Sequence, residues 1–315
     1  MFRNPQCLLR PLLAVSALIL AASAWAAESL PPRGFSTPEE AAKVLVDAAR
    51  VGDAAGLAAI FGSAGSDIVS SGDPVEDEND RKTFVDLAGG KLRIERVGED
   101  QAVLFLGPDD WPFPIPLVRS SDTWGFDVEK GREELLDRRI GRNELNVLKV
   151  MEAYLQAQAE YASQDRDGDQ VAEYAQKIRS EPGQFDGLFW ETAVNEPASP
   201  LGPLVADARA EGYRAKNAEQ PRPYHGYYYR ILTRQGGQAS GGKYSYIING
   251  NMIAGFALLA FPAEYGSSGI MSFIVNQQGN IYQKDLGSKT KQIAATLNEY
   301  NPDSSWTLVH QGESL

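Results

Sequence analysis

Residues 134–161, ELLDRRIGRNELNVLKVMEAYLQAQAEY, decide the fold, because they predict one long helix in the middle of the chain. Apolar residues recur in this segment every three or four positions, which is the spacing of one helical face. The members of this predicted face are Leu145, Leu148, Met151, Leu155 and Ala159. The segments before and after the helix have other patterns, so we expect two parts joined through it.

The segment before the helix predicts helices followed by an antiparallel sheet. Thr37 is a candidate N-cap, Pro38 fits the first helical position and Glu40 completes a capping box. A short helix is expected over residues 54–62, and a polar acidic loop over residues 63–81. Alternating polar and apolar residues then predict strands in LRIERV, AVLFLG, IPLVRS and TWGFDV.

The segment after the helix predicts further strands with little helix between them. HGYYYRILTRQ, YSYIING and AGFALLAFP are rich in aromatic and apolar residues, and GIMSFIVNQQGNIYQKDLG predicts a hairpin whose turn contains Gly279. Short helices are expected over residues 203–210 and 290–299. The predicted class is α+β: an N-terminal helix pair plus antiparallel sheet in residues 27–135, then a long helix packed on a C-terminal antiparallel sheet in residues 136–315.

The first 26 residues predict a signal peptide. Arg3 and Arg10 supply basic charge around the start of an apolar run, PLLAVSALILAA, and Ala24-Trp25-Ala26 fits the small-x-small cleavage rule. The apolar run is short for a membrane span, and no later stretch reaches that length. We therefore expect a periplasmic or secreted protein with no transmembrane segment after cleavage.

Composition restricts the classes of function. The 315 residues include 30 Lys and Arg against 42 Asp and Glu, a net charge of -12, which disfavours nucleic acid as a partner. Two His and one Cys argue against His-based triads, zinc sites and disulfide scaffolds. His225, beside Tyr224, is expected to be a strand-edge or surface residue, and His310 likewise.

Three stretches together carry a resemblance to a known family: MEAYLQAQAEYASQDRDGDQVAEYAQK, HGYYYRILTRQGG and FPAEYGSSGIMSFIVNQQGNIYQKDLG. They resemble the bacterial secreted family known as domain of unknown function 2950. This resemblance spans nearly the whole predicted mature chain and implies no reaction and no catalytic residues. The order of a long helix before antiparallel strands is also similar to type IV pilins, although a pilin helix begins at the mature N-terminus. The second resemblance implies a pilin-like C-terminal part.

The loop after the long helix is a candidate calcium site. Calcium prefers several oxygen ligands, and Asp165, Asp167 and Asp169 alternate as in the first half of an EF-hand loop. Val171 could add its carbonyl oxygen and Glu173 a carboxylate. Gln170 and Gln176 replace the EF-hand glycine and bidentate glutamate, so a solvated polar turn is the alternative. No other metal or cofactor is predicted.

The composition and the candidate residues are compatible with two classes of function. The leading interpretation is a non-enzymatic binding or structural-interaction module of the bacterial envelope, whose partner is an envelope protein or a glycan. The alternative is an envelope hydrolase that cleaves glycan or peptidoglycan through carboxylates, with Trp111, Trp124 or Trp190 stacking on sugars. A deep pocket with convergent carboxylates, or a His–carboxylate pair, would favour the enzyme.

Overall fold

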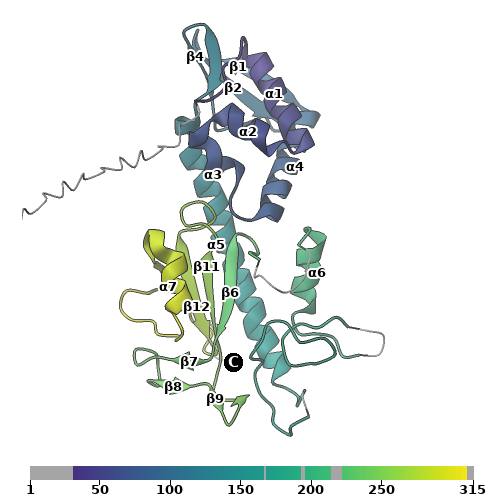
Figure 1. Cartoon of the computed structure of the whole chain (residues 1–315), viewed down its shortest axis with the longest axis vertical. Coiled ribbons are helices and arrows are strands. Elements are labelled where there is room, and N and C mark those ends of the chain that lie inside the picture. Colours follow the sequence, from purple (N-terminus) through teal and green to yellow (C-terminus); the bar gives the residue numbers. More distant parts are fainter. Residues whose placement is uncertain (1–30, 167, 193–195, 214–221, 311–315) are drawn as a thin grey trace, which may run out of the picture.

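The computed structural model describes residues 31–166, 168–192, 196–213 and 222–310. The predicted signal peptide and Asp167 lie outside this part of the chain. Figure 1 shows a group of helices and a small sheet at one end, a second sheet at the other, and one long helix that runs along both.

Four helices open the described part of the chain, with a 3-10 turn at Ser63–Gly65 between the second and third. They are α1 (Pro38–Val51), α2 (Ala54–Phe61), α3 (Ser66–Val69) and α4 (Pro74–Gly90). The predicted cap of α1 is confirmed: the Thr37 hydroxyl accepts the Glu40 N–H at 3.1 Å, and the Glu40 carboxylate accepts the Ser36 N–H at 2.8 Å.

The predicted acidic loop over residues 63–81 is wrong, because most of it is helical. Asp73 caps α4 by accepting the N–H groups of Val75 and Glu76 on one carboxylate oxygen. Pro74 occupies the first turn, where its missing N–H costs nothing. Glu76 and Asp77 also lie in that turn, where the positive end of the helix dipole favours carboxylates.

The N-terminal sheet is antiparallel, as predicted. Its strands are β1 (Leu92–Arg96), β2 (Gln101–Leu106), β3 (Trp111–Pro112), β4 (Leu117–Ser120) and β5 (Thr123–Phe126). They pair in the order β1-β2-β4-β5, with β3 on β2. Along β2 every second residue is buried, so one face of the sheet packs on the helices.

The long helix α5 spans Val128–Tyr161 and ends where the sequence predicts, but it begins six residues earlier. Its buried face differs from the predicted one. Met151 is fully buried, Leu148 and Leu155 are half-buried, and Leu145 is 63% exposed. The face that packs on the C-terminal sheet includes Val147, Met151, Tyr154, Ala157 and Tyr161.

The C-terminal sheet is antiparallel, in the order β14-β13-β12-β11-β6. Its strands are β6 (Tyr227–Leu232), β11 (Ala257–Pro262), β12 (Met271–Asn276), β13 (Ile281–Asp285) and β14 (Thr307–His310). The β12–β13 turn has Gly279 at φ 75°, as predicted. Two small sheets pair β7 (Arg234–Gln235) with β8 (Tyr244–Ser245), and β9 (Ile247–Ile248) with β10 (Asn251–Met252).

Helices border this sheet on two sides (Figure 1). Helix α5 packs on β12, and α7 (Thr290–Thr296), which follows a 3-10 turn at Gly287–Lys289, packs on β11. Arg230 of β6 donates 2.6 Å hydrogen bonds to the carbonyl oxygens of Ala294 and Leu297, which ties the end of α7 to the sheet. The predicted helix at residues 203–210 is confirmed as α6 (Gly202–Ala210).

The described residues bury two hydrophobic clusters. One lies within residues 35–128 and the other within residues 147–300. The predicted α+β class with a long helix and a C-terminal antiparallel sheet is therefore confirmed, whereas the boundary at residues 135 and 136 stays a prediction. In the described part of the chain, no helix combines the length and apolar character needed to cross a membrane.

Candidate functional site

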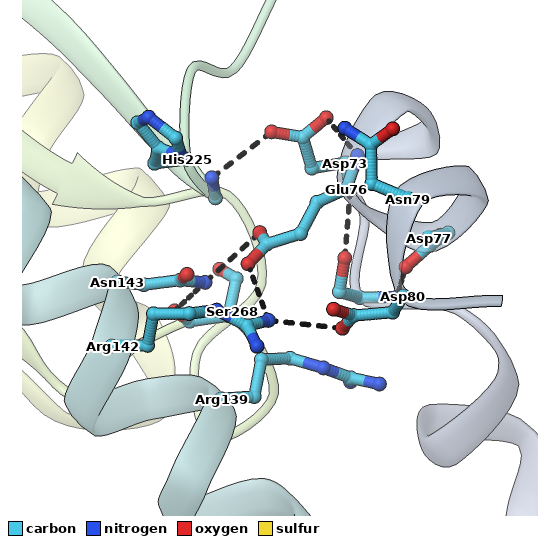
Figure 2. A network of polar contacts seen from close by, with 12 residues as sticks. Asp73, Glu76, Asp77, Asn79, Asp80, Arg139, Arg142, Asn143, His225 and Ser268 are labelled. Carbon is cyan, nitrogen blue, oxygen red and sulfur yellow. Dashed lines mark hydrogen bonds and ion pairs between the residues drawn. The ribbon is translucent and has the colours of Figure 1, made fainter. Parts of the chain in front are cut away.

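Polar side chains meet where α4, α5 and the C-terminal sheet come together (Figure 2). Asp73 is almost completely buried there, with 1% of its surface exposed. Besides capping α4 it accepts the Tyr213 hydroxyl at 2.8 Å and the Gly226 N–H at 3.0 Å. One carboxylate thus connects the first turn of α4 with the segment that leads into β6.

Glu76, one turn along α4, points at α5. Its carboxylate accepts Arg142 Nη2 at 2.9 Å and Asn143 Nδ2 at 3.1 Å. Asn143 also donates to the Ser268 carbonyl oxygen at 3.0 Å. We call this set the polar joint. It consists of Asp73, Glu76, Asp80, Arg142, Asn143, Tyr213, Gly226 and Ser268.

Burial controls the charges of the polar joint. The Glu76 side chain is 7% exposed, and burial raises the pKa of its carboxyl although Arg142 opposes the shift. Burial and the neighbouring Asp73 carboxylate raise the pKa of Tyr213, so its hydroxyl remains a donor. Arg142 also pairs with Asp80 at 2.9 Å at the exposed edge.

His225 lies beside the polar joint. Its Nε2 is 3.2 Å from the Glu211 carboxylate, and its backbone N–H donates to the Tyr213 hydroxyl at 3.1 Å. Burial lowers the pKa of the imidazole, against the effect of Glu211. Gly226 follows at φ 72°, where a Cβ would lie 2.6 Å from Asn143 Nδ2. The His–carboxylate pair sought in the sequence therefore exists, but it is packed into a contact between segments.

The sequence reasoning missed Arg142, Asn143 and Tyr213. One signal was available: Asn143 occupies a position of the helical stripe that runs through Leu136, Ile140 and Val147, where an apolar residue is expected. Asn143 is fully buried. A polar residue in such a stripe indicates a buried hydrogen-bond partner, here Glu76.

The carboxylates of the Asp-rich loop accept hydrogen bonds from the backbone of the same loop. Asp165 accepts the N–H of Gly168 at 2.8 Å and of Gln170 at 2.9 Å, and Asp169 accepts that of Val171 at 2.8 Å. Gln170 takes φ 74°, the left-handed conformation that an EF-hand glycine would supply. Asp167, the central candidate ligand, lies outside the described residues.

The second half of the loop contacts the β9–β10 hairpin. Asp169 accepts Asn251 Nδ2 at 2.6 Å, and Glu173 accepts the Met252 N–H at 2.6 Å. Gln176, at the twelfth position, donates to the Gly250 carbonyl oxygen at 2.7 Å. Among the residues that the structure describes, no group of three or more His, Cys, Asp or Glu side chains is arranged to hold a metal ion. Calcium binding stays a prediction.

Open hollows lie on the surface of the described residues. One, of about 590 Å³, lies between α1, α4 and β1 and includes Lys43, Arg50 and Arg93. Another, of about 450 Å³, lies between α3, α5 and the β11–β12 loop. Neither is lined by His225 or by the carboxylates of the polar joint.

The predicted sugar-stacking residues are used in packing. Trp124 and Trp190 are 4% and 5% exposed, and Trp111 packs edge-on against Phe113. Tyr227 is fully buried in the C-terminal core. These rings are therefore part of the cores and not of an exposed binding surface.

Comparison with models of known families identifies the family of this chain. The model of a family described as protein of unknown function (DUF2950) matches residues 32–309. The chain belongs to this family. No curated protein and no solved structure matches it. The resemblance stated from the sequence is confirmed, and the similarity to pilins stays a prediction.

Proposed function

We propose that this DUF2950 member is a periplasmic or secreted, non-enzymatic binding or structural-interaction module of the bacterial envelope, with an envelope protein or glycan as partner. One observation carries the proposal. Of the groups best suited to acid–base chemistry, Asp73 and Glu76 join α4 to the segment before β6 and to α5, and His225 is paired with Glu211 at the end of α6. The signal-like N-terminus supports the proposed location.

The alternative, a glycan hydrolase, needs a carboxylic acid and a second carboxylate on opposite sides of the scissile bond. The 450 Å³ hollow does bring two carboxylates together, those of Asp67 and Glu264. Each of them is tied to a cation, Asp67 to Arg132 and Glu264 to Lys291 at 2.6 Å. This pairing favours a binding surface over a catalytic pair.

Cosedimentation tests the proposal. The purified mature chain is incubated with washed peptidoglycan sacculi and, separately, with outer-membrane vesicles, and the supernatant is analysed for released fragments. We expect the chain to pellet with one of the two fractions and to release nothing. Soluble glycan fragments that accumulate with time would instead establish the hydrolase, and a chain that stays in every supernatant would contradict the envelope role.

Intact-mass measurement of the protein from a periplasmic extract tests the location. We expect a mass that lacks residues 1–26, because the cleavage rule is met after Ala26. A mass that includes these residues would contradict the cleaved signal.

A further inference from the structure

The 450 Å³ hollow combines side chains from three distant segments of the chain. Ser66, Asp67 and Ser70 come from α3 and its C-cap, Arg132 from the start of α5, and the rest from the β11–β12 loop. The complete lining is Ser66, Asp67, Ser70, Arg132, Glu264, Tyr265, Gly266 and Ser267. We call it the Asp67–Tyr265 hollow. Its volume lies within the range of small-ligand sites, about 300–1,000 Å³.

The walls of this hollow are held in place by contacts outside it. Arg139, on α5, donates to the carbonyl oxygens of Asp67 and Ile68 at 2.7 and 2.8 Å. It also contacts the Ser267 hydroxyl at 3.3 Å, so one guanidinium fixes α3 relative to the β11–β12 loop. The Tyr265 hydroxyl donates to Asp285 at 3.2 Å, which orients the ring. The hollow is therefore preorganised by the fold.

Several polar groups in the hollow retain hydrogen-bonding capacity. Arg132 binds one oxygen of Asp67 through Nε and Nη2, which leaves Nη1 for a ligand. Glu264 binds Lys291 through Oε1, which leaves Oε2. The Arg132 and Glu264 side chains are 43% and 54% exposed, so a ligand in the hollow can reach this donor and this acceptor.

The charges of the hollow select the class of ligand. A free cation is disfavoured because Arg132 and Lys291 already oppose the two carboxylates, and an anion is disfavoured by the carboxylates themselves. A neutral molecule with many hydroxyl groups meets both signs, since each hydroxyl donates and accepts. The half-buried ring of Tyr265 adds an apolar face beside these polar groups, which suits the C–H face of a sugar.

We propose that the Asp67–Tyr265 hollow binds a neutral saccharide unit. The sugar hydroxyls accept from Arg132 Nη1 and donate to Glu264 Oε2, and the sugar ring lies on Tyr265. The inference rests on the proposed envelope function and selects a glycan from its two classes of partner. Binding requires no covalent step.

Saturation-transfer difference NMR on the mature chain tests this proposal, with N,N′-diacetylchitobiose and maltotriose as probes. Each probe is titrated to about 20 mM, because shallow sites with few contacts bind in the millimolar range. We expect a saturable signal from at least one probe. Arg132→Gln and Tyr265→Leu should each weaken it about tenfold or more, the usual effect of losing a hydrogen bond to a charged group or a packing surface.

Arg50→Gln is the matched control, because Arg50 lines the other hollow and also pairs with an aspartate. It should leave the signal unchanged. Circular dichroism establishes that each variant is folded, and Tyr265→Leu keeps the test valid if the Arg132 variant does not fold. Absence of saturable binding by both probes, or binding that persists in both variants, would overturn the saccharide site. Cosedimentation that persists in the Arg132 variant would then leave the envelope role standing without this site.

Discussion

Within the polar joint, burial disfavours the ionised form of the Glu76 carboxyl. Asp73 and Asp80 add repulsion, whereas Arg142 and the Asn143 amide stabilise the carboxylate without offsetting its burial. The pKa of Glu76 is raised above its usual value of 4.5, so the folded protein holds the proton more tightly than the unfolded chain does. The stability that this carboxyl contributes is therefore present in full below pH 4.5 and is lost as the pH rises through the raised folded pKa.

Glu76→Gln removes this titration. We expect the difference between the melting temperature of the variant and that of the wild type to increase as the pH rises from 4 to 7.5, because only the wild type ionises at this position. A relative gain of about 1 kcal/mol corresponds to about 2–4 °C in a protein of this size. Thermal denaturation at several pH values measures it.

Asn79→Ala is the control for this measurement. It removes a hydrogen bond of the same helix, from Asn79 Nδ2 to the Glu211 carbonyl oxygen at 2.9 Å, and no titrating group. Its difference from wild type should stay flat with pH. A Glu76→Gln difference that is equally flat, or that falls with pH, would contradict the pKa argument. His225, whose pKa is lowered, gives the opposite pH dependence, and comparison with wild type cancels it.

At the scale of elements, α5 shows which features of a helix can be predicted from the spacing of apolar residues. The spacing of apolar residues predicts the helix and its last residue, Tyr161. It does not determine which side is buried, because leucines occur around the whole circumference and tertiary contacts select among them. Leu145 belongs to the predicted apolar face and is exposed. Asn143 is a polar residue within another face of the helix and is buried.

Substitutions on α5 test this assignment. Met151→Ala should lower the free energy of unfolding by about 2–5 kcal/mol, because it leaves a cavity at a fully buried site. Leu145→Ala should change it by less than about 0.5 kcal/mol, as at other exposed positions. Urea denaturation of the two variants measures both values. Equal losses would contradict the observed orientation of the helix.

The start of α4 shows a signal that was present but not used. Asp73-Pro74-Val75-Glu76 has the same pattern as Thr37-Pro38-Glu39-Glu40, a capping residue, a proline and an acid three positions later. The high density of carboxylates suggested a solvated loop instead. The partners of Asp73, by contrast, had no local signal, since Tyr213 and Gly226 are 140 and 153 residues away.

The Asp-rich loop after α5 raises the question of whether it binds calcium. Glu173 and Gln176 bind the β9–β10 hairpin, so the second half of the loop is occupied by structural contacts. We therefore expect 1 mM calcium to leave the melting temperature unchanged in differential scanning calorimetry. A site saturated a hundredfold over its Kd would add about 2.7 kcal/mol of stability. A rise in melting temperature that Asp169→Asn abolishes would restore the calcium hypothesis.

At the scale of the whole molecule, the two hydrophobic clusters are coupled by α5 and by the contacts around it. Helix α5 contributes Val128 to the first cluster and Val147 to the second. Between these positions, Arg139 and Asn143 hold α3, α4 and the β11–β12 loop, and Glu144 accepts the N–H groups of Ile270 and Met271. A helix that is shared in this way cannot lose one cluster without exposing residues that support the other.

We therefore expect the two parts to unfold together. Native-state hydrogen exchange should give the same unfolding free energy for the slowest amides of β2 and of β11, because both report one global transition. Asp73→Ala should lower both values together, by about 1–3 kcal/mol, since it leaves the Gly226 N–H and the Tyr213 hydroxyl without their acceptor. The contrary result is a variant in which the β2 amides lose protection while the β11 amides keep it. It would show that residues near the predicted boundary at 135 and 136 separate two independent folding units. The polar joint would then be only a contact between these units.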